Sequence, residues 1–193
     1  MAAIEPAASR RKEQILDAAT LCFSQKGFHR SSLAHIAAVA GMSPGHIYHY
    51  YKSKEDIVAA IVARERNESE QILTKAQSVG GDTSGAALFL CQLAQGLALH
   101  KDPARASLTM EILAEASRNP VIAEVVQRNN VELHQSLYQL LGDRSAKTRS
   151  KMEIIGALMS GLSIRALRNP QLDQDLDEEM LGRVIKFILS EES

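Results

Sequence analysis

Apolar residues recur at intervals of three and four along most of the chain, and this spacing is typical of amphipathic α-helices. In the first segment Ile15, Ala19 and Phe23 belong to such a stripe, which predicts a helix over about residues 10–25. Gly27 follows, where a glycine can take the left-handed conformation that ends many helices. No segment shows sustained apolar–polar alternation with β-branched enrichment, so the predicted fold class is all-α.

Residues 32–51 predict two short helices joined by a tight turn. The first begins near Ser32, whose hydroxyl suits a helix cap, and ends at Gly41. The second begins after a further capping serine, Ser43, with Pro44 in its first turn, where the missing N–H costs nothing. Because only three residues separate the helices, they must meet at a sharp angle, which is the helix-turn-helix arrangement.

The remaining sequence predicts a long fourth helix and then a helical bundle. Ser53 and Asp56 resemble a capping box, which opens a helix that reaches about Gln77, and residues 79–84 predict a loop. Further helices are expected over about 84–100, 103–117, 120–141, 147–168 and 177–189, which makes about nine helices in all. We therefore expect an N-terminal helix-turn-helix domain over residues 1–56, joined by the long helix to a second domain over residues 57–193.

Composition and charge narrow the classes of protein. The 193 residues are 45% hydrophobic and 23% charged, which is ordinary for a globular chain, and the formal net charge is −1. The charge is unevenly spread, because residues 1–56 sum to +2 and the remainder to −3, which suggests a partner specific to the first half. Without an apolar run of 18 residues or a signal sequence, a cytoplasmic location is expected.

The residues around the predicted turn have the chemistry of a DNA-reading helix. A helix that enters the major groove needs small and polar residues at its N-terminal end, as Ser43, Gly45 and His46 provide. Tyr48 and His49 can hydrogen-bond to phosphates. His46 and His49 lie three residues apart and could suggest a pair of metal ligands, but no third ligand follows at helical spacing. Neither a metal nor any other cofactor is therefore expected.

This stretch resembles the TetR family of bacterial transcriptional repressors. The resemblance rests on Ile36-Ala37, on Ala40-Gly41-Met42-Ser43-Pro44-Gly45-His46-Ile47-Tyr48, and on Ser53-Lys54-Glu55, and it covers about residues 10–63. The sequence departs from the family pattern where Ser32 replaces Thr, Tyr51 replaces Phe, and Pro44 replaces a residue that is often polar or basic. Ile47 and Tyr51 are expected in the core.

The resemblance implies which residues face DNA and what the second domain does. The DNA-facing positions are Ser32, His35, Ser43, Pro44, Gly45, His46, Tyr48, His49, Tyr50 and Lys54. In the family the C-terminal bundle holds a small-molecule pocket and a dimer interface, so both are expected in residues 57–193.

Pocket candidates are polar or polarizable residues on otherwise apolar faces. They are Phe89, Leu93, His100, Met110, Glu111, Glu115, His134, Tyr138 and Met159. Each also suits ordinary packing, and Glu111 or Glu115 could instead pair with Arg118 at the surface. A buried glutamate would suit a cationic ligand, because buried charges need a partner.

Two apolar stripes near the C-terminus are candidates for the dimer interface. They are Ile155, Met159, Leu162 and Ala166, and then Leu181, Val184, Ile185 and Ile188. Gly156 and Gly161 would permit close approach in a two-fold four-helix bundle. The alternative is that one stripe is only the core of a single protomer.

The resulting hypothesis is a homodimeric repressor rather than an enzyme. It binds a palindromic operator in double-stranded DNA, is released by a small-molecule ligand, and controls an efflux or metabolic operon. A helical-bundle metal hydrolase would need a ligand set such as paired Glu-x-x-His, which the sequence lacks. A protein-binding module with the helix-turn-helix as scaffold remains an alternative, as does a redox role for Cys22 or Cys91, although both cysteines are expected to be buried and inert.

Overall fold

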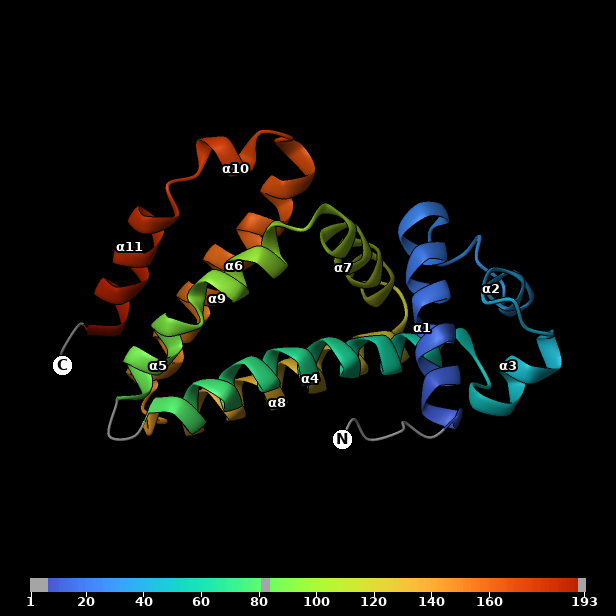
Figure 1. Cartoon of the computed structure of the whole chain (residues 1–193), viewed down its shortest axis with the longest axis horizontal. Helices are drawn as coiled ribbons and strands as arrows, with labels where there is room; N and C mark the ends of the chain where they lie inside the picture. The colour runs from blue at the N-terminus through green and yellow to red at the C-terminus, as the bar shows by residue number, and fades with distance from the viewer. Residues whose placement is uncertain (1–6, 81–83, 191–193) are drawn as a thin grey trace. The chain divides into compact units, whose positions relative to one another are not determined.

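The computed structural model describes residues 7–80 and 84–190, and across them the chain forms α-helices without a β-strand (Figure 1). This confirms the all-α fold class. The helices are α1 (Ala7–Lys26), α2 (Leu33–Val39), α3 (Pro44–Tyr50), α4 (Lys54–Gly80), α5 (Gly85–Cys91), α6 (Leu93–Lys101), α7 (Pro103–Ala116), α8 (Pro120–Leu141), α9 (Ala146–Arg168), α10 (Leu172–Asp175) and α11 (Glu178–Ser190). No helix within the described ranges has the length and apolarity needed to cross a membrane.

The structure differs from the predicted helix plan at three places. The helix expected over 84–100 is divided at Gln92, whose N–H bonds to Phe89 O at 3.1 Å and closes α5 before α6 begins. The one-turn helix α10 lies where no helix was expected. α4 runs to Gly80, and residues 81–83 of the predicted loop lie outside the described residues.

The helices form two compact units. The first unit contains the described residues up to Arg64 together with 107–127, and the second contains 65–106 together with the described residues from 128 onward. The predicted boundary after residue 56 therefore falls inside α4, and most of α7 and the start of α8 belong to the same unit as the helix-turn-helix. α4, α7 and α8 each contribute residues to both units.

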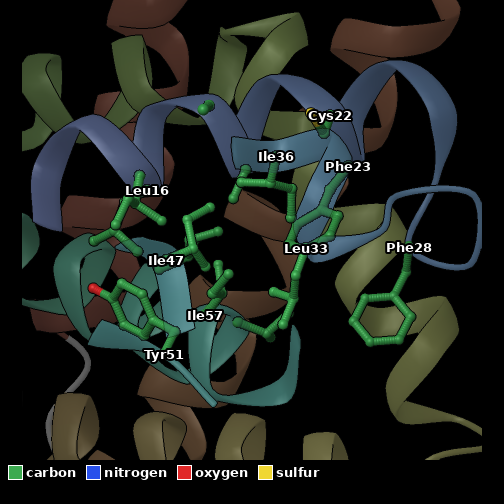
Figure 2. Close-up of a cluster of buried hydrophobic side chains, with 14 of the residues drawn as sticks. Leu16, Cys22, Phe23, Phe28, Leu33, Ile36, Ile47, Tyr51 and Ile57 are labelled. Atoms are coloured by element: carbon green, nitrogen blue, oxygen red, sulfur yellow. The ribbon is translucent and has the colours of Figure 1, made fainter. Parts of the chain in front are cut away.

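A continuous apolar core holds the first unit together. Phe23 of α1, Ile36 of α2, Ile47 of α3 and Ile57 of α4 are at most 1% exposed, and Figure 2 shows Leu16, Ile47, Tyr51 and Ile57 converging in this core. Leu108, Ile112 and Ile122 of α7 and α8 complete it. Burial of one such side chain contributes about 1.5–3 kcal/mol, so α3 is held firmly by its buried side. The predicted core positions Ile47 and Tyr51 are confirmed.

The second unit has its own core. α6 packs on α9, and α11 contacts both α5 and α9. Leu97, Met152, Ile155 and Ile185 are buried where these helices meet. Polar contacts join α4 to α8 in the same unit, where Arg66 pairs with Glu132 and Ser136 Oγ donates to Glu70 Oε1 at 3.0 Å.

Candidate nucleic-acid interface

The turn between α2 and α3 is built from local interactions that the sequence specifies. Ser32 Oγ accepts a hydrogen bond from His35 N at 3.1 Å and caps α2. Gly41 has φ +64°, a conformation that a side chain would strain, and Met42 N donates back to Ala37 O at 2.9 Å. The chain therefore reverses within three residues and starts α3 at Pro44.

α3 has one buried side and one open side. Ile47 is its buried residue, whereas Ser43, Pro44, Gly45, His46, Tyr48 and His49 are exposed. Tyr48 is 57% exposed. Against the prediction, Ser43 makes no side-chain cap bond, which leaves its hydroxyl available at the start of the helix.

The exposed rings of His46 and His49 both contact the ring of Tyr50, which is half-buried and packs against the first-unit core. The His46 ring stacks on the Tyr50 ring with centroids 5.6 Å apart and planes at 18°, and His49 meets Tyr50 edge-on at 5.0 Å. Stacking restricts the rotamers of these side chains, so they are partly ordered without a ligand. The arrangement offers ring N–H, hydroxyl and apolar edges, which suit base edges and phosphates in a major groove.

Besides Ser32, two predicted DNA-facing residues have side-chain partners within the protein. His35 Nε2 lies 3.0 Å from Lys26 Nζ. Lys54 Nζ donates to Phe28 O at 2.6 Å and lies 4.0 Å from the centroid of the Phe28 ring. The Lys54 ammonium therefore joins the start of α4 to the turn that connects α1 and α2.

Two predicted pocket residues, Glu111 and Glu115 of α7, hold this same turn. Glu111 Oε1 accepts a hydrogen bond from Phe28 N at 2.5 Å. Glu115 is 3% exposed, and its Oε2 lies 2.9 Å from His29 Nε2 and 3.1 Å from Arg118 Nε. Nothing in the local sequence signals these contacts, because Phe28 and Glu111 are 83 positions apart. Both carboxylates, with Met110, belong to the first unit.

The other six pocket candidates lie in the second unit. Phe89, Leu93, Tyr138 and Met159 belong to its apolar core. His100 Nδ1 lies 3.1 Å from Ser163 Oγ, and burial, followed by the Arg105 charge, lowers the pKa of His100. His134 Nδ1 lies 3.4 Å from Tyr138 Oη and 3.7 Å from Glu153 Oε1.

The predicted dimer residues are mostly buried in their own protomer. Ile155, Met159, Leu162, Ala166 and Ile185 are each at most 9% exposed, and Leu181 and Ile188 pack against the same core. Among the predicted residues, Val184 is exposed. The large apolar side chains that are exposed on these two helices are Ile154, Ile164 and Leu167 in α9, and Met180, Val184 and Phe187 in α11. Each residue along a helix turns by about 100°, so residues one or two positions from the buried stripe face away from the protomer's own core.

The cysteines also differ from each other. Cys22 is buried, and burial raises the pKa of its thiol, whereas Cys91 is exposed at the end of α5 against expectation. Within the described residues, no group of three or more His, Cys, Asp or Glu side chains has the arrangement of a metal site.

Comparisons with known proteins agree with this geometry. Residues 15–61 match the family model described as "Bacterial regulatory proteins, tetR family". The chain is 26% identical over 178 residues to the HTH-type transcriptional regulator UidR of Escherichia coli K12, which covers 91% of this chain and 86% of that protein. It is 38% identical over 69 residues to the HTH-type transcriptional repressor BepR of Brucella suis. This match covers 36% of this chain and 33% of that protein. The solved structure of Salmonella enterica GusR superposes with a TM-score of 0.71 at 25% identity, covering 97% and 96% of the two chains.

Proposed function

This chain belongs to the TetR family of DNA-binding transcriptional regulators, and from that premise we propose that it is a homodimeric repressor whose α3 helices read a palindromic operator. A small molecule bound in the second unit releases it from DNA. BepR is named as a transcriptional repressor, which supports repression rather than activation as the proposed effect on transcription. We propose an efflux or metabolic operon as the target.

The open side of α3 carries the proposal. Ser43, Gly45, His46, Tyr48 and His49 are exposed on a helix whose other side is anchored by fully buried Ile47. A rigid helix with one polar side free is what insertion into a major groove requires. An exposed tyrosine ring on a seven-residue helix also has no packing role within the protomer to explain it.

Exposed apolar side chains of the second unit support the dimer. Ile154, Ala157, Gly161 and Ile164 follow one another at helical spacing on α9, and a Cβ added at Gly161 would meet nothing within 4 Å. Met180, Val184 and Phe187 form a second stripe on α11, which contacts α9. Two such helices from each protomer suit a four-helix interface around a two-fold axis. A dimer would then present two α3 helices to two half-sites.

The proposed release by a ligand requires unequal binding to two states. A ligand that binds both equally shifts no population, however tightly it binds. α4, α7 and α8 contribute residues to both units, so they are the elements through which a change in one unit can reach the other. The candidates Phe89, Tyr138 and Met159 are apolar residues of the second-unit core, and His100 adds a polar group, which is the mixture that small-molecule sites usually have.

The test is selection of a DNA sequence by the full-length protein from a pool of random duplexes. The wild type is expected to enrich a palindrome, and His46→Ala and Tyr48→Ala are each expected to weaken binding to it by about tenfold or more. Tyr48→Phe separates hydroxyl contacts from ring contacts. Failure to enrich any sequence, or unchanged affinity in both alanine variants, would overturn the proposal. Mapping the enriched sequence on the genome identifies the controlled genes.

A further inference from the structure

The helix proposed to read DNA carries no lysine or arginine. α3 runs Pro-Gly-His-Ile-Tyr-His-Tyr, and its polar groups are imidazoles and phenols. Neutralisation of phosphates by lysine and arginine supplies most of the sequence-independent affinity for DNA. If the protein binds DNA as proposed above, the cations must come from elsewhere in the first unit.

Four cations of the first unit are already engaged by the protein, and one of them is Arg118, which pairs with Glu115. Lys54 Nζ bonds to Phe28 O, and Lys26 Nζ lies 3.0 Å from His35 Nε2. Arg64 Nη1 bonds to Glu13 Oε2 at 3.1 Å and to Asp17 Oδ1 at 2.7 Å. The last pair of contacts also occupies two carboxylates of α1 that could otherwise neutralise neighbouring cations.

The start of α1 concentrates positive charge where a helix does not favour it. Arg10, Arg11 and Lys12 are consecutive and exposed, and the first turn of α1 has no acidic residue. Within the described residues, no carboxylate forms an ion pair with any of the three. Arg10 closes the first turn of α1, where the helix dipole is positive, so this cation does not stabilise the helix, whereas Arg11 and Lys12 follow in the second turn.

Arg11 is connected to the turn that precedes α3. Arg11 Nη1 donates to Gln14 Oε1 at 2.9 Å, and Gln14 Nε2 donates to Ala40 O at 2.7 Å. Ala40 is the C-cap of α2, and Ser43 begins the approach to α3 three residues later. The Gln14 amide thus bridges the guanidinium to the α2–α3 turn. Most of the five N–H donors of Arg11 remain uncommitted.

Arg10 lies on the same side of α1. Residues four apart on a helix are neighbours, so Arg10 and Gln14 share a face, and residues three apart, as Arg11 and Gln14 are, do so as well. Lys12 is two positions from Gln14 and does not share that face. Two guanidiniums therefore lie on the side of α1 that contacts the turn before the reading helix.

We propose that Arg10 and Arg11 form a phosphate-binding site that anchors the DNA backbone beside α3. This inference rests on the proposed function. A guanidinium matches two phosphate oxygens with parallel N–H donors. Gln14 orients Arg11, and hence acts as a positioning residue, while α3 reads the adjacent groove. In this division the arginines supply affinity and salt dependence, whereas α3 supplies sequence preference.

The experiment compares the wild type with the double variant Arg10→Gln/Arg11→Gln on the duplex that the wild type selects. Arg144→Gln is the matched control, because Arg144 is an exposed arginine of the second unit. Affinity is measured across a range of salt concentrations. The slope of log affinity against log salt is expected to fall by about 0.9 for each phosphate that is no longer neutralised, and so by up to about 3.6 for the four arginines of a dimer. The sequence selected by the double variant should stay the same.

Thermal stability separates binding from folding. Arg10 and Arg11 are both exposed, and Arg10 lies in the first turn of α1, where the helix dipole disfavours a cation, so the double variant should melt at about the temperature of the wild type. Weaker, less salt-dependent binding by an equally stable protein supports the phosphate site. A salt slope equal to that of the wild type and Arg144→Gln overturns it, while enrichment of a palindrome by the wild type would leave the proposed function standing. If the wild type selects no duplex, the proposed function fails and this inference fails with it.

Discussion

The backbone N–H of Phe28 donates a hydrogen bond to Glu111 Oε1 at 2.5 Å, across 83 positions of sequence. The carbonyl of Phe28 accepts a hydrogen bond from Lys54 Nζ at 2.6 Å. One residue of the α1–α2 turn is therefore held on its N–H by α7 and on its carbonyl by α4. The turn precedes α2 directly, so these contacts help to set the position of the helix-turn-helix within the first unit.

Glu111→Ala should destabilise the protein by about 1–3 kcal/mol. Phe28 is 4% exposed, and loss of the carboxylate leaves its N–H without an acceptor. Glu111→Gln keeps an oxygen at the same place and should cost less than the alanine variant. Urea unfolding of the full chain measures both free energies. Equal stability of wild type and Glu111→Ala would show that the hydrogen bond does not contribute.

Gly27→Ala and Gly45→Ala should change stability in opposite directions. Gly27 has φ +82°, and an added Cβ would lie 3.0 Å from Glu111 Oε1, so the substitution should cost at least about 1–2 kcal/mol. Gly45 lies inside α3 with nothing within 4 Å of an added Cβ, so alanine should stabilise the helix by about 0.5–1 kcal/mol.

Binding to the selected duplex gives the second readout for this pair. Gly45→Ala adds a methyl group to the open side of α3 and should weaken DNA binding despite its greater stability. Thermal unfolding and a binding titration on the same samples check both statements. A stabilised Gly45→Ala variant with unchanged affinity would place Gly45 outside the interface.

Because of His100, the free energy of unfolding should decrease as the pH falls below about 6.5. Burial lowers the pKa of His100 in the folded state, so the unfolded chain takes up a proton that the folded chain does not. Stability is therefore greatest above the ordinary pKa of 6.5 and decreases as acid protonates the unfolded state. Unfolding at a series of pH values should give a flatter curve for His100→Gln. Parallel curves for the two proteins would contradict the assignment to His100.

Val184→Glu should shift the proposed dimer toward monomer. Val184 is 43% exposed on the apolar stripe of α11, and a buried, unpaired carboxylate at an interface is costly. Val131→Glu is the matched control, because Val131 is 54% exposed on α8 and outside the proposed interface. Sedimentation at a series of protein concentrations measures both. If Val131→Glu dissociated the dimer and Val184→Glu did not, the interface would lie on another face than the one proposed.

Local features of the sequence determined most of the helix plan, including α2, the turn after it and α3. Helical spacing marks the apolar side of each segment, and Gly41, Pro44 and the Ser32 cap specify the turn through the φ angles and hydrogen bonds that they permit. Ile47 and Tyr51 could be assigned to the core because burial follows from that spacing. These properties depend on residues within one or two helical turns of each other, which is why they can be predicted without a structure.

The tertiary structure decided which neighbour each polar group meets. Lys54, expected to face DNA, donates a hydrogen bond to the Phe28 carbonyl, and the pocket candidates Glu111 and Glu115 contact Phe28 and His29 of the α1–α2 turn. On α9 and α11 the spacing identified apolar stripes but not which side the protomer itself would cover. A hydrogen bond or a packed face depends on helices far apart in sequence being brought within a few ångströms. Periodicity along one helix contains no information about that approach.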